Sequence, residues 1–183
     1  MSKSKFTTAP AMMACDSSRT TIDAAKEWLR NHTAKGGECP CCRQRVQFYN
    51  RPLTSSMAYV LILIDRYCRS HTDWLHVPSH LSSLGVGEAA RGGDWAKMVH
   101  WGLITREPGG VRRDKSSRTG FWRTTDLGHA FVAGTASVRK HVLMYNKKPL
   151  PKEEQDPNPP LVSIRDSLGN RFDYEKLMAG GVR

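Results

Sequence analysis

Apolar residues recur at helical spacing most clearly between residues 55 and 69. The positions that share one face are Met57, Val60, Leu61, Ile64 and either Tyr67 or Cys68. Residues three or four positions apart lie on the same side of an α-helix, so the pattern predicts the strongest helix of the chain here. Ser55 or Ser56 is expected to cap its N-terminus.

An earlier helix is predicted from Ser18 or Thr21 to about His32, because either residue is a suitable N-cap and Gly36 and Gly37 follow its end. The residues after these glycines alternate between apolar and polar from position 45 to 50. This alternation predicts a strand that follows a turn rich in cysteine.

The segment after residue 76 has the order of elements of a winged helix-turn-helix. Two short helices are followed by a strand, a basic glycine-rich loop, a return strand and a further helix. The expected bounds are 77–81 and 88 or 94 to 102 for the two helices, 103–104 and 120–124 for the strands, 107–119 for the loop, and 125–132 for the closing helix. The predicted fold class is therefore α+β with a winged helix-turn-helix core.

The remaining segments complete the expected domain organisation. Residues 137–146 are predicted as a strand, and the next segment is rich in proline, which is typical of a linker. The chain is expected to comprise a tail (1–17), a helix with a cysteine knuckle and strand (18–53), the winged helix-turn-helix (54–146), a linker (147–160) and a small C-terminal β-hairpin–helix unit (161–183).

The charge of the chain favours an anionic partner. It has 28 Lys and Arg residues against 17 Asp and Glu residues, a formal net charge of +11. Polymeric phosphate is the most common partner of such a protein, although a basic surface can also serve solubility alone. The longest apolar run, residues 58–65, ends at Asp65 and is too short to span a membrane, and no signal peptide is apparent, so a cytoplasmic location is expected.

The basic residues concentrate where a winged helix meets nucleic acid. One helix of this fold enters the major groove, and a basic hairpin loop lies along the phosphate backbone. In the helix from Asp94 to Trp101 we expect Trp95, Met98 and Val99 to pack inward, with Trp101 partly buried. The candidate contacts to double-stranded DNA are Arg91, Lys97, His100, Arg106, Arg112, Arg113, Lys115 and Arg118.

Cys39 and Cys42 have the C-x-x-C spacing that lets two thiolates bind one zinc ion. A closed zinc site needs four ligands and the chain has no second C-x-x-C. His32 is the next candidate ligand, and Cys41 is an alternative. A later group could also complete the site: Cys68, His71, His76 and His80. A structural zinc ion is expected, against the alternative of reduced cysteines in a tight turn.

No catalytic motif is apparent, and the protein is not expected to be an enzyme. A glycine-rich phosphate loop, H-E-x-x-H and G-x-S-x-G are all missing from the sequence. The histidines together with Asp65 or Asp73 have no spacing that favours a particular hydrolytic site.

Several stretches resemble small phage and prophage proteins of uncharacterised role: "WLRNH…CPCCRQRVQFYNRPL", "GGDWAKMVHWGLI", "RTGFWRTTDLGHAFV" and "HVLMYN". Residues 93–132 are also similar in layout to the helix and wing of marR-type regulators, although the chain lacks their long terminal helices for dimerisation. The resemblance implies a winged-helix core in a bacterial or phage cytoplasmic context.

Two functions are compatible with these observations. The first is a regulatory protein that binds double-stranded DNA through the predicted helix and wing. The second is a protein-interaction module that binds or inhibits a host factor, for which an exposed Phe121 or Trp122 would be favourable. The sequence leaves the oligomeric state open.

Overall fold

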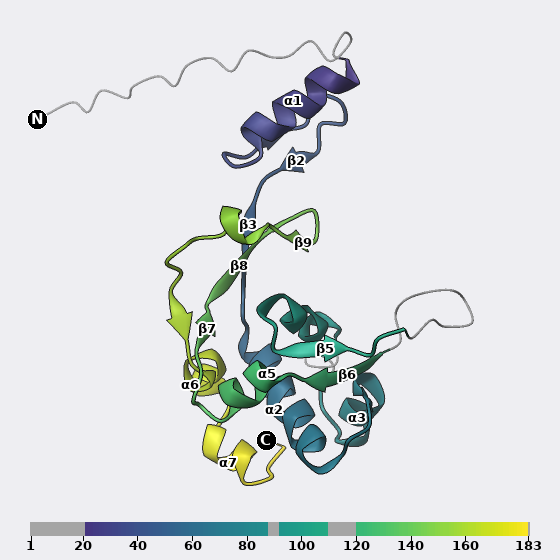
Figure 1. The fold of residues 1–183 in the computed structure, drawn as a ribbon, viewed down its shortest axis with the longest axis vertical. Helices are drawn as coiled ribbons and strands as arrows, with labels where there is room; N and C mark the ends of the chain where they lie inside the picture. The colour runs from purple at the N-terminus through teal and green to yellow at the C-terminus, as the bar shows by residue number, and fades with distance from the viewer. Residues whose placement is uncertain (1–20, 88–91, 110–119, 183) are drawn as a thin grey trace, which may run out of the picture. The chain divides into compact units, whose positions relative to one another are not determined.

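A computed structural model describes residues 21–87, 92–109 and 120–182 of the chain (Figure 1). Helices and strands are mixed along it, which confirms the α+β class. The chain divides into two compact units, Met1–Tyr49 and Asn50–Arg183. No helix in the described residues is both long and apolar enough to cross a membrane.

The first unit is a helix followed by a small hairpin. Helix α1 (Ile22–His32) begins after Thr21, whose side chain accepts a hydrogen bond of 3.2 Å from the Ala24 N–H. Thr21 is therefore the cap, and Ser18 lies outside the described residues. Strands β1 (Gly37–Glu38) and β2 (Arg45–Val46) pair antiparallel around the cysteine turn.

The strand predicted over residues 45–50 is divided into two pieces. After β2 the Phe48 N–H donates to the Thr33 carbonyl at 3.2 Å, so the chain bonds to the end of α1 at this point. Strand β3 (Tyr49–Pro52) begins only afterwards and pairs with β8 (His141–Tyr145).

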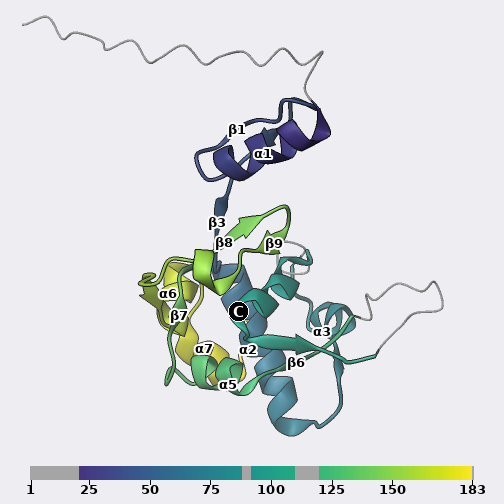
Figure 2. The same ribbon diagram turned by 45° about the horizontal axis from the view of Figure 1, so that its top comes forward.

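The second unit is built around helix α2 (Ser55–Ser70). Its cap is Thr54, which accepts from the Met57 N–H at 3.3 Å, and not Ser55 or Ser56 as predicted. Every residue from Met57 to Asp65 is buried, so the helix is surrounded on all sides and does not lie on the surface with one apolar face. Figure 2 shows α2 between α3 and β6 on one side and α5 and α6 on the other.

A three-stranded antiparallel sheet covers one side of α2. Its strands are β4 (Leu75–His76), β5 (Ile104–Arg106) and β6 (Phe121–Thr124), in the order β4-β6-β5. Leu75 lies opposite Trp122, and Arg106 lies opposite the same residue on the other edge. Helix α3 (Val77–Ser83) and helix η1 (Asp94–Trp101) lie between β4 and β5 in the sequence.

Helix η1 is a 3-10 helix, whereas the sequence predicted an α-helix. Its buried side chains are Trp95, Met98 and Trp101, at intervals of three residues. A helix with three residues per turn keeps such positions on one face, which explains the tighter winding. Val99, which was predicted to face inward, is 40% exposed, because it lies one residue off this stripe.

The segment predicted as a linker is folded against β8. It contains β9 (Lys148–Pro149), which pairs with β8, and η2 (Lys152–Glu154). The buried Gln155 side chain donates to the carbonyls of Leu143 and Leu150 and accepts from the Leu143 N–H, at 2.9 to 3.0 Å. These tertiary hydrogen bonds hold the proline-rich segment in place.

The C-terminal residues belong to the same core and form no hairpin of their own. Strand β10 (Leu161–Val162) pairs with β7 (Val138–Arg139) instead. The helical elements are α5 (Asp126–Val132), α6 (Ile164–Leu168), η3 (Gly169–Arg171) and α7 (Tyr174–Met178). Ser163 and Asp166 form a capping box that starts α6 at Ile164.

The close approach of α5 to the strand before it gives a test of this packing. A Cβ at Gly128 would lie 2.1 Å from the Leu103 carbonyl oxygen, which belongs to the backbone and cannot easily move. We expect Gly128→Ala to lower the free energy of unfolding by roughly 1–3 kcal/mol in chemical denaturation. Gly87→Ala, where a Cβ meets nothing within 4 Å, should change it by less than about 0.5 kcal/mol. Equal effects of the two substitutions would contradict the described contact.

Candidate nucleic-acid interface

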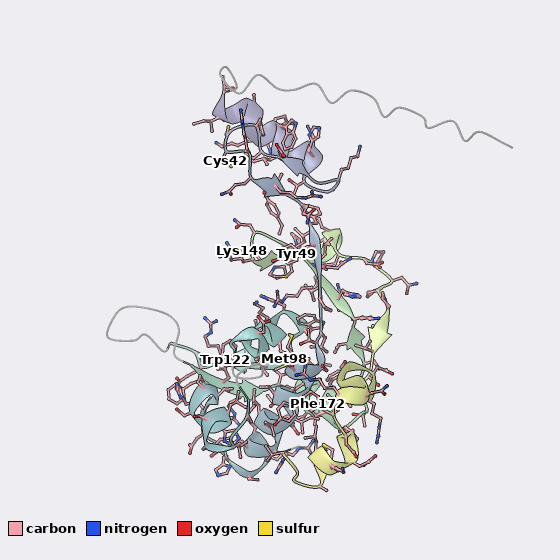
Figure 3. All side chains as sticks on the ribbon, turned by 180° about the vertical axis from the view of Figure 1, so that it is seen from behind. Cys42, Tyr49, Met98, Trp122, Lys148 and Phe172 are labelled. Carbon is pink, nitrogen blue, oxygen red and sulfur yellow. The ribbon has the colours of Figure 1, made fainter. Side chains whose placement is uncertain are left out.

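Trp122 connects the β5–β6 hairpin to helix η1, and Arg106 packs on its ring. Because Arg106 and Trp122 are directly opposite each other in the sheet, their side chains share one face. The Arg106 guanidinium lies over the Trp122 ring at 4.9 Å, and Trp122 meets Trp95 edge-on at 5.5 Å (Figure 3). The exposed cation of the hairpin is thereby held next to the start of η1.

A second cationic group surrounds Asp94 at the N-terminus of η1. Lys97 donates to the Asp94 carboxylate at 2.6 Å, and Arg51 from β3 donates to the same oxygen at 3.0 Å. The hydrogen bond from Lys97 is the main reason that the pKa of Asp94 is lowered, and the charges of Lys97 and Arg51 add to it. One carboxylate thus orients two cations, which leaves a net positive charge.

His100 lies on the same helix and is half-buried. Burial lowers its pKa below the ordinary value, and the positive charges of Arg51 and Lys97 lower it further. The ring is therefore neutral at pH 7, with one hydrogen-bond donor and one acceptor. We call Arg51, Lys97, His100 and Arg106 the basic face.

The structure describes three of the predicted DNA contacts: Lys97, His100 and Arg106. The others lie outside the described residues: Arg91, Arg112, Arg113, Lys115 and Arg118. Trp101, for which the sequence favoured a partly buried packing role, is fully buried, and its indole N–H donates to the Arg139 carbonyl at 2.7 Å. Arg51 was missed, because it is 43 residues from Asp94 and nothing local signals that ion pair.

The opposite face of the sheet carries aromatic and cationic side chains. Phe121 is 37% exposed and lies opposite His76, with the two rings 5.1 Å apart. Arg123 is two residues further along β6, and its guanidinium lies 5.8 Å from the centre of the Trp74 ring. Of the two aromatics considered for a protein interface, Phe121 is therefore accessible and Trp122 is buried.

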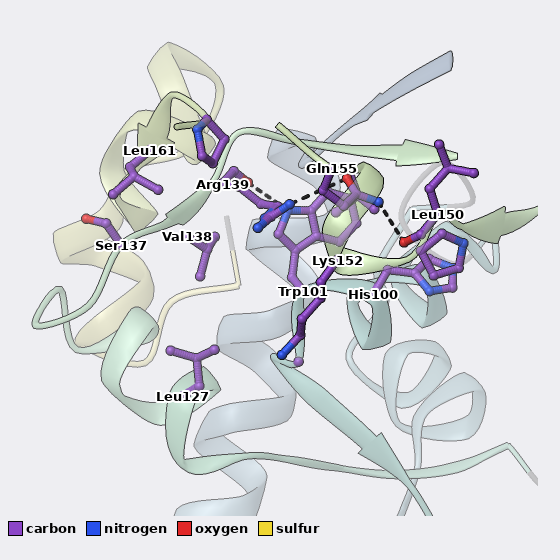
Figure 4. A pocket seen from close by; sticks show the side chains of 14 residues that line it. His100, Trp101, Leu127, Ser137, Val138, Arg139, Leu150, Lys152, Gln155 and Leu161 are labelled. Carbon is purple, nitrogen blue, oxygen red and sulfur yellow. Dashed lines mark hydrogen bonds between the residues drawn. The ribbon is translucent and has the colours of Figure 1, made fainter. Parts of the chain in front are cut away.

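A groove of about 570 Å³ begins at the C-terminal end of η1 (Figure 4). Its apolar edges include Leu127 and Leu161, which are 41% and 63% exposed. Lys152 reaches into the groove, and Arg139 lines it next to Gln155. The described lining residues include no carboxylate.

The cysteine turn, residues 39–43, carries three free thiols. Cys39 is buried, whereas Cys41 and Cys42 are exposed. Hydrogen bonding from the backbone of Cys42 and then of Cys41 lowers the pKa of the Cys39 thiol below its ordinary value, because it stabilises the thiolate.

The predicted third ligand, His32, belongs to α1. Its Nδ1 donates to the Trp28 carbonyl at 2.8 Å, and its ring stacks on Trp28 with the centroids 4.3 Å apart. Within residues 21–87, 92–109 and 120–182, no three ligand-type side chains are grouped so that they could hold a metal ion. Of the alternative group, Cys68 is buried in the core, and His71 and His80 pack against Tyr67.

A buried acid–base pair lies in the core and was not predicted. Asp65 is fully buried, with His129 Nδ1 2.5 Å from one carboxylate oxygen and Arg69 Nε 2.7 Å from the other. Asp65 and His129 are 64 residues apart, so no sequence spacing joins them. His129 is half-exposed. The pair ties α5 to α2 within the core.

The chain matches no protein-family model, and no curated protein or solved structure is significantly similar to it. The resemblance to phage proteins stays a prediction.

The lowered pKa of His100 predicts a pH-dependent stability. The unfolded chain takes up a proton on His100 below about pH 6.5, while the folded state resists it, so stability falls as the pH is lowered through this range. His80, whose pKa is also lowered by burial, contributes in the same direction. We expect His100→Gln to flatten the dependence of the unfolding free energy on pH below about pH 6.5.

The effect of Asp94 on the pKa of His100 can be measured directly. Asp94→Asn removes the counter-charge of Arg51 and Lys97, so the pKa of His100 should fall further in an NMR titration. A rise in that pKa would contradict the described arrangement.

Proposed function

We propose that the second unit is a winged helix-turn-helix that binds double-stranded DNA and acts as a regulator of phage or bacterial origin. The observation that carries the proposal is the contact of Arg106 with Trp122 and of Trp122 with Trp95, which joins a basic hairpin to η1. In a winged helix the recognition helix and the wing bind the same duplex, so they must be held together in this way.

The order of elements supports the same proposal. The first helix would be α2, β4 the first strand, α3 the second helix and η1 the recognition helix, followed by the hairpin β5–β6. The sheet order β4-β6-β5 has the first strand beside the return strand, as a wing requires. At about 2 Å per residue, the eight residues of η1 are long enough to lie in the major groove.

Each member of the basic face has a distinct role in this proposal. Lys97 and Arg106 would contact phosphates, because Lys97 is a half-exposed cation and Arg106 an exposed one. His100, neutral at pH 7, offers both a donor and an acceptor to base edges. Arg51 is held by Asp94 and would mainly raise the local potential.

The proposal predicts salt-dependent binding that depends on two named cations. Labelled random-sequence duplex is titrated with protein over a salt series, and anisotropy reports binding. Lys97→Glu/Arg106→Glu should weaken binding at least about tenfold and reduce the salt slope by about two. Lys140→Glu/Lys176→Glu, an equal change of charge on the β7–β8 turn and α7, should have a much smaller effect.

Thermal denaturation of both variants controls for folding, because Lys97→Glu removes an ion pair with Asp94. Arg112→Glu/Arg113→Glu tests the wing loop in the same assay. If Lys97→Glu/Arg106→Glu and Lys140→Glu/Lys176→Glu weaken binding equally, the net charge and not the basic face determines binding. If even low salt produces no binding, the proposal is wrong.

The groove favours a second candidate function, an interaction module for a host protein. Its exposed Leu127 and Leu161 suit apolar side chains, while Lys152 and Arg139 suit carboxylates, so an acidic segment with apolar residues would fit. This function predicts that a host protein co-purifies stoichiometrically after nuclease treatment. Its binding should be lost in Leu161→Asp and kept in Lys97→Glu/Arg106→Glu. Loss in both variants would contradict a separate site.

A further inference from the structure

The outer face of the β4-β6-β5 sheet combines aromatic rings with a cation. Phe121 and Arg123 are two residues apart on β6, so their side chains share one face. His76 on β4 is paired with Phe121. Thr105 on β5 is paired with Arg123, so each neighbouring strand adds a side chain to this face. Trp74 precedes β4, and the Arg123 guanidinium lies over its ring. We call these five residues the aromatic face.

The inner face of the same sheet is part of the core. The positions that alternate with the aromatic face along the three strands are all buried: Leu75, Ile104, Trp122 and Thr124. Their burial fixes which face of the sheet is turned to solvent. Phe121, in contrast, is 37% exposed, so a ligand can reach its ring without any rearrangement of the core.

The Phe121 ring packs against a neighbour that is itself held in place. His76 Nδ1 and the Ser79 hydroxyl are hydrogen-bonded at 2.6 Å. The His76 ring also lies against Gly120, where a Cβ would be 2.7 Å from Nε2, so a larger residue there would displace the ring. The centroids of His76 and Phe121 are 5.1 Å apart. A ring positioned in this way loses less conformational entropy when a ligand stacks on it.

An unpaired nucleobase is the ligand that this chemistry suits. Every base has a flat π-face that stacks on an aromatic side chain, and an arginine beside it can bind the adjoining phosphate. The net charge of +11 attracts a polyanion from a distance. A base within a duplex is stacked on both sides and cannot offer its face, so the ligand is a single strand.

We propose that the aromatic face binds single-stranded nucleic acid by stacking an unpaired base on Phe121, with Arg123 placed for a phosphate. This site is on the opposite face of the sheet from the contact between Arg106 and Trp122, so it is separate from the basic face. The proposal goes beyond duplex binding and does not depend on it.

The test separates stacking from charge by comparing oligomers with the same backbone. One is an oligodeoxyuridine of about ten nucleotides, a typical length for a single-strand site, and the other is an abasic oligomer with the same number of phosphates. Both carry a fluorescent label and are titrated with the full chain while anisotropy is followed. We expect the oligodeoxyuridine to bind at least about tenfold more tightly. An oligouridine of equal length then shows whether the site prefers DNA or RNA.

Substitutions of Phe121 show whether the ring itself is responsible. Phe121→Leu keeps an apolar side chain without the ring and should remove most of the preference for the oligomer with bases. Phe121→Tyr retains the ring and should keep that preference within about twofold. Leu127→Ala changes another exposed apolar side chain, on α5, and should have no effect. Thermal denaturation of each variant controls for folding.

Equal binding of the oligodeoxyuridine and the abasic oligomer would overturn the proposal, because charge alone would then explain the affinity. A preference for bases that persists in Phe121→Leu would also overturn it. If that variant instead loses only a co-purifying host protein, the aromatic face is a protein interface and the proposal is wrong. Lys97→Glu/Arg106→Glu should weaken duplex binding and keep the preference for bases, so the failure of one proposal is distinguishable from the failure of the other.

Discussion

The burial of α2 is the constraint on which the second unit depends. Its residues from Met57 to Asp65 are all inaccessible to solvent, so the elements around it must cover it on every side. Each fully buried aliphatic side chain contributes about 1.5–3 kcal/mol. Asp65 opposes this gain, because removing a carboxylate from water costs several kcal/mol unless it is paired.

The pairing of Asp65 links the core to the surface proposed to bind DNA. His129 on α5 and Arg69 on α2 both bond to its carboxylate, which ties α5 to α2. Helix α5 directly follows β6, and Thr125 at its cap bonds to the Gly102 carbonyl at the end of η1 at 2.5 Å. The buried acid therefore helps to fix the positions of the hairpin and of η1.

The sequence predicted those elements whose signal is local. Helix α2 followed from its apolar spacing and α1 from its Thr21 cap, and the β5–β6 pair was predicted within a few residues. The winding of η1 was missed although Trp95, Met98 and Trp101 lie at intervals of three. Contacts between distant parts of the chain were not predictable, because local sequence patterns do not reveal them. Examples are Arg51 with Asp94, Asp65 with His129, and Gln155 with Leu143. The folded state of the segment predicted as a linker has the same origin. The hydrogen bonds of Gln155 hold this segment against β8, and its prolines gave no sign of them.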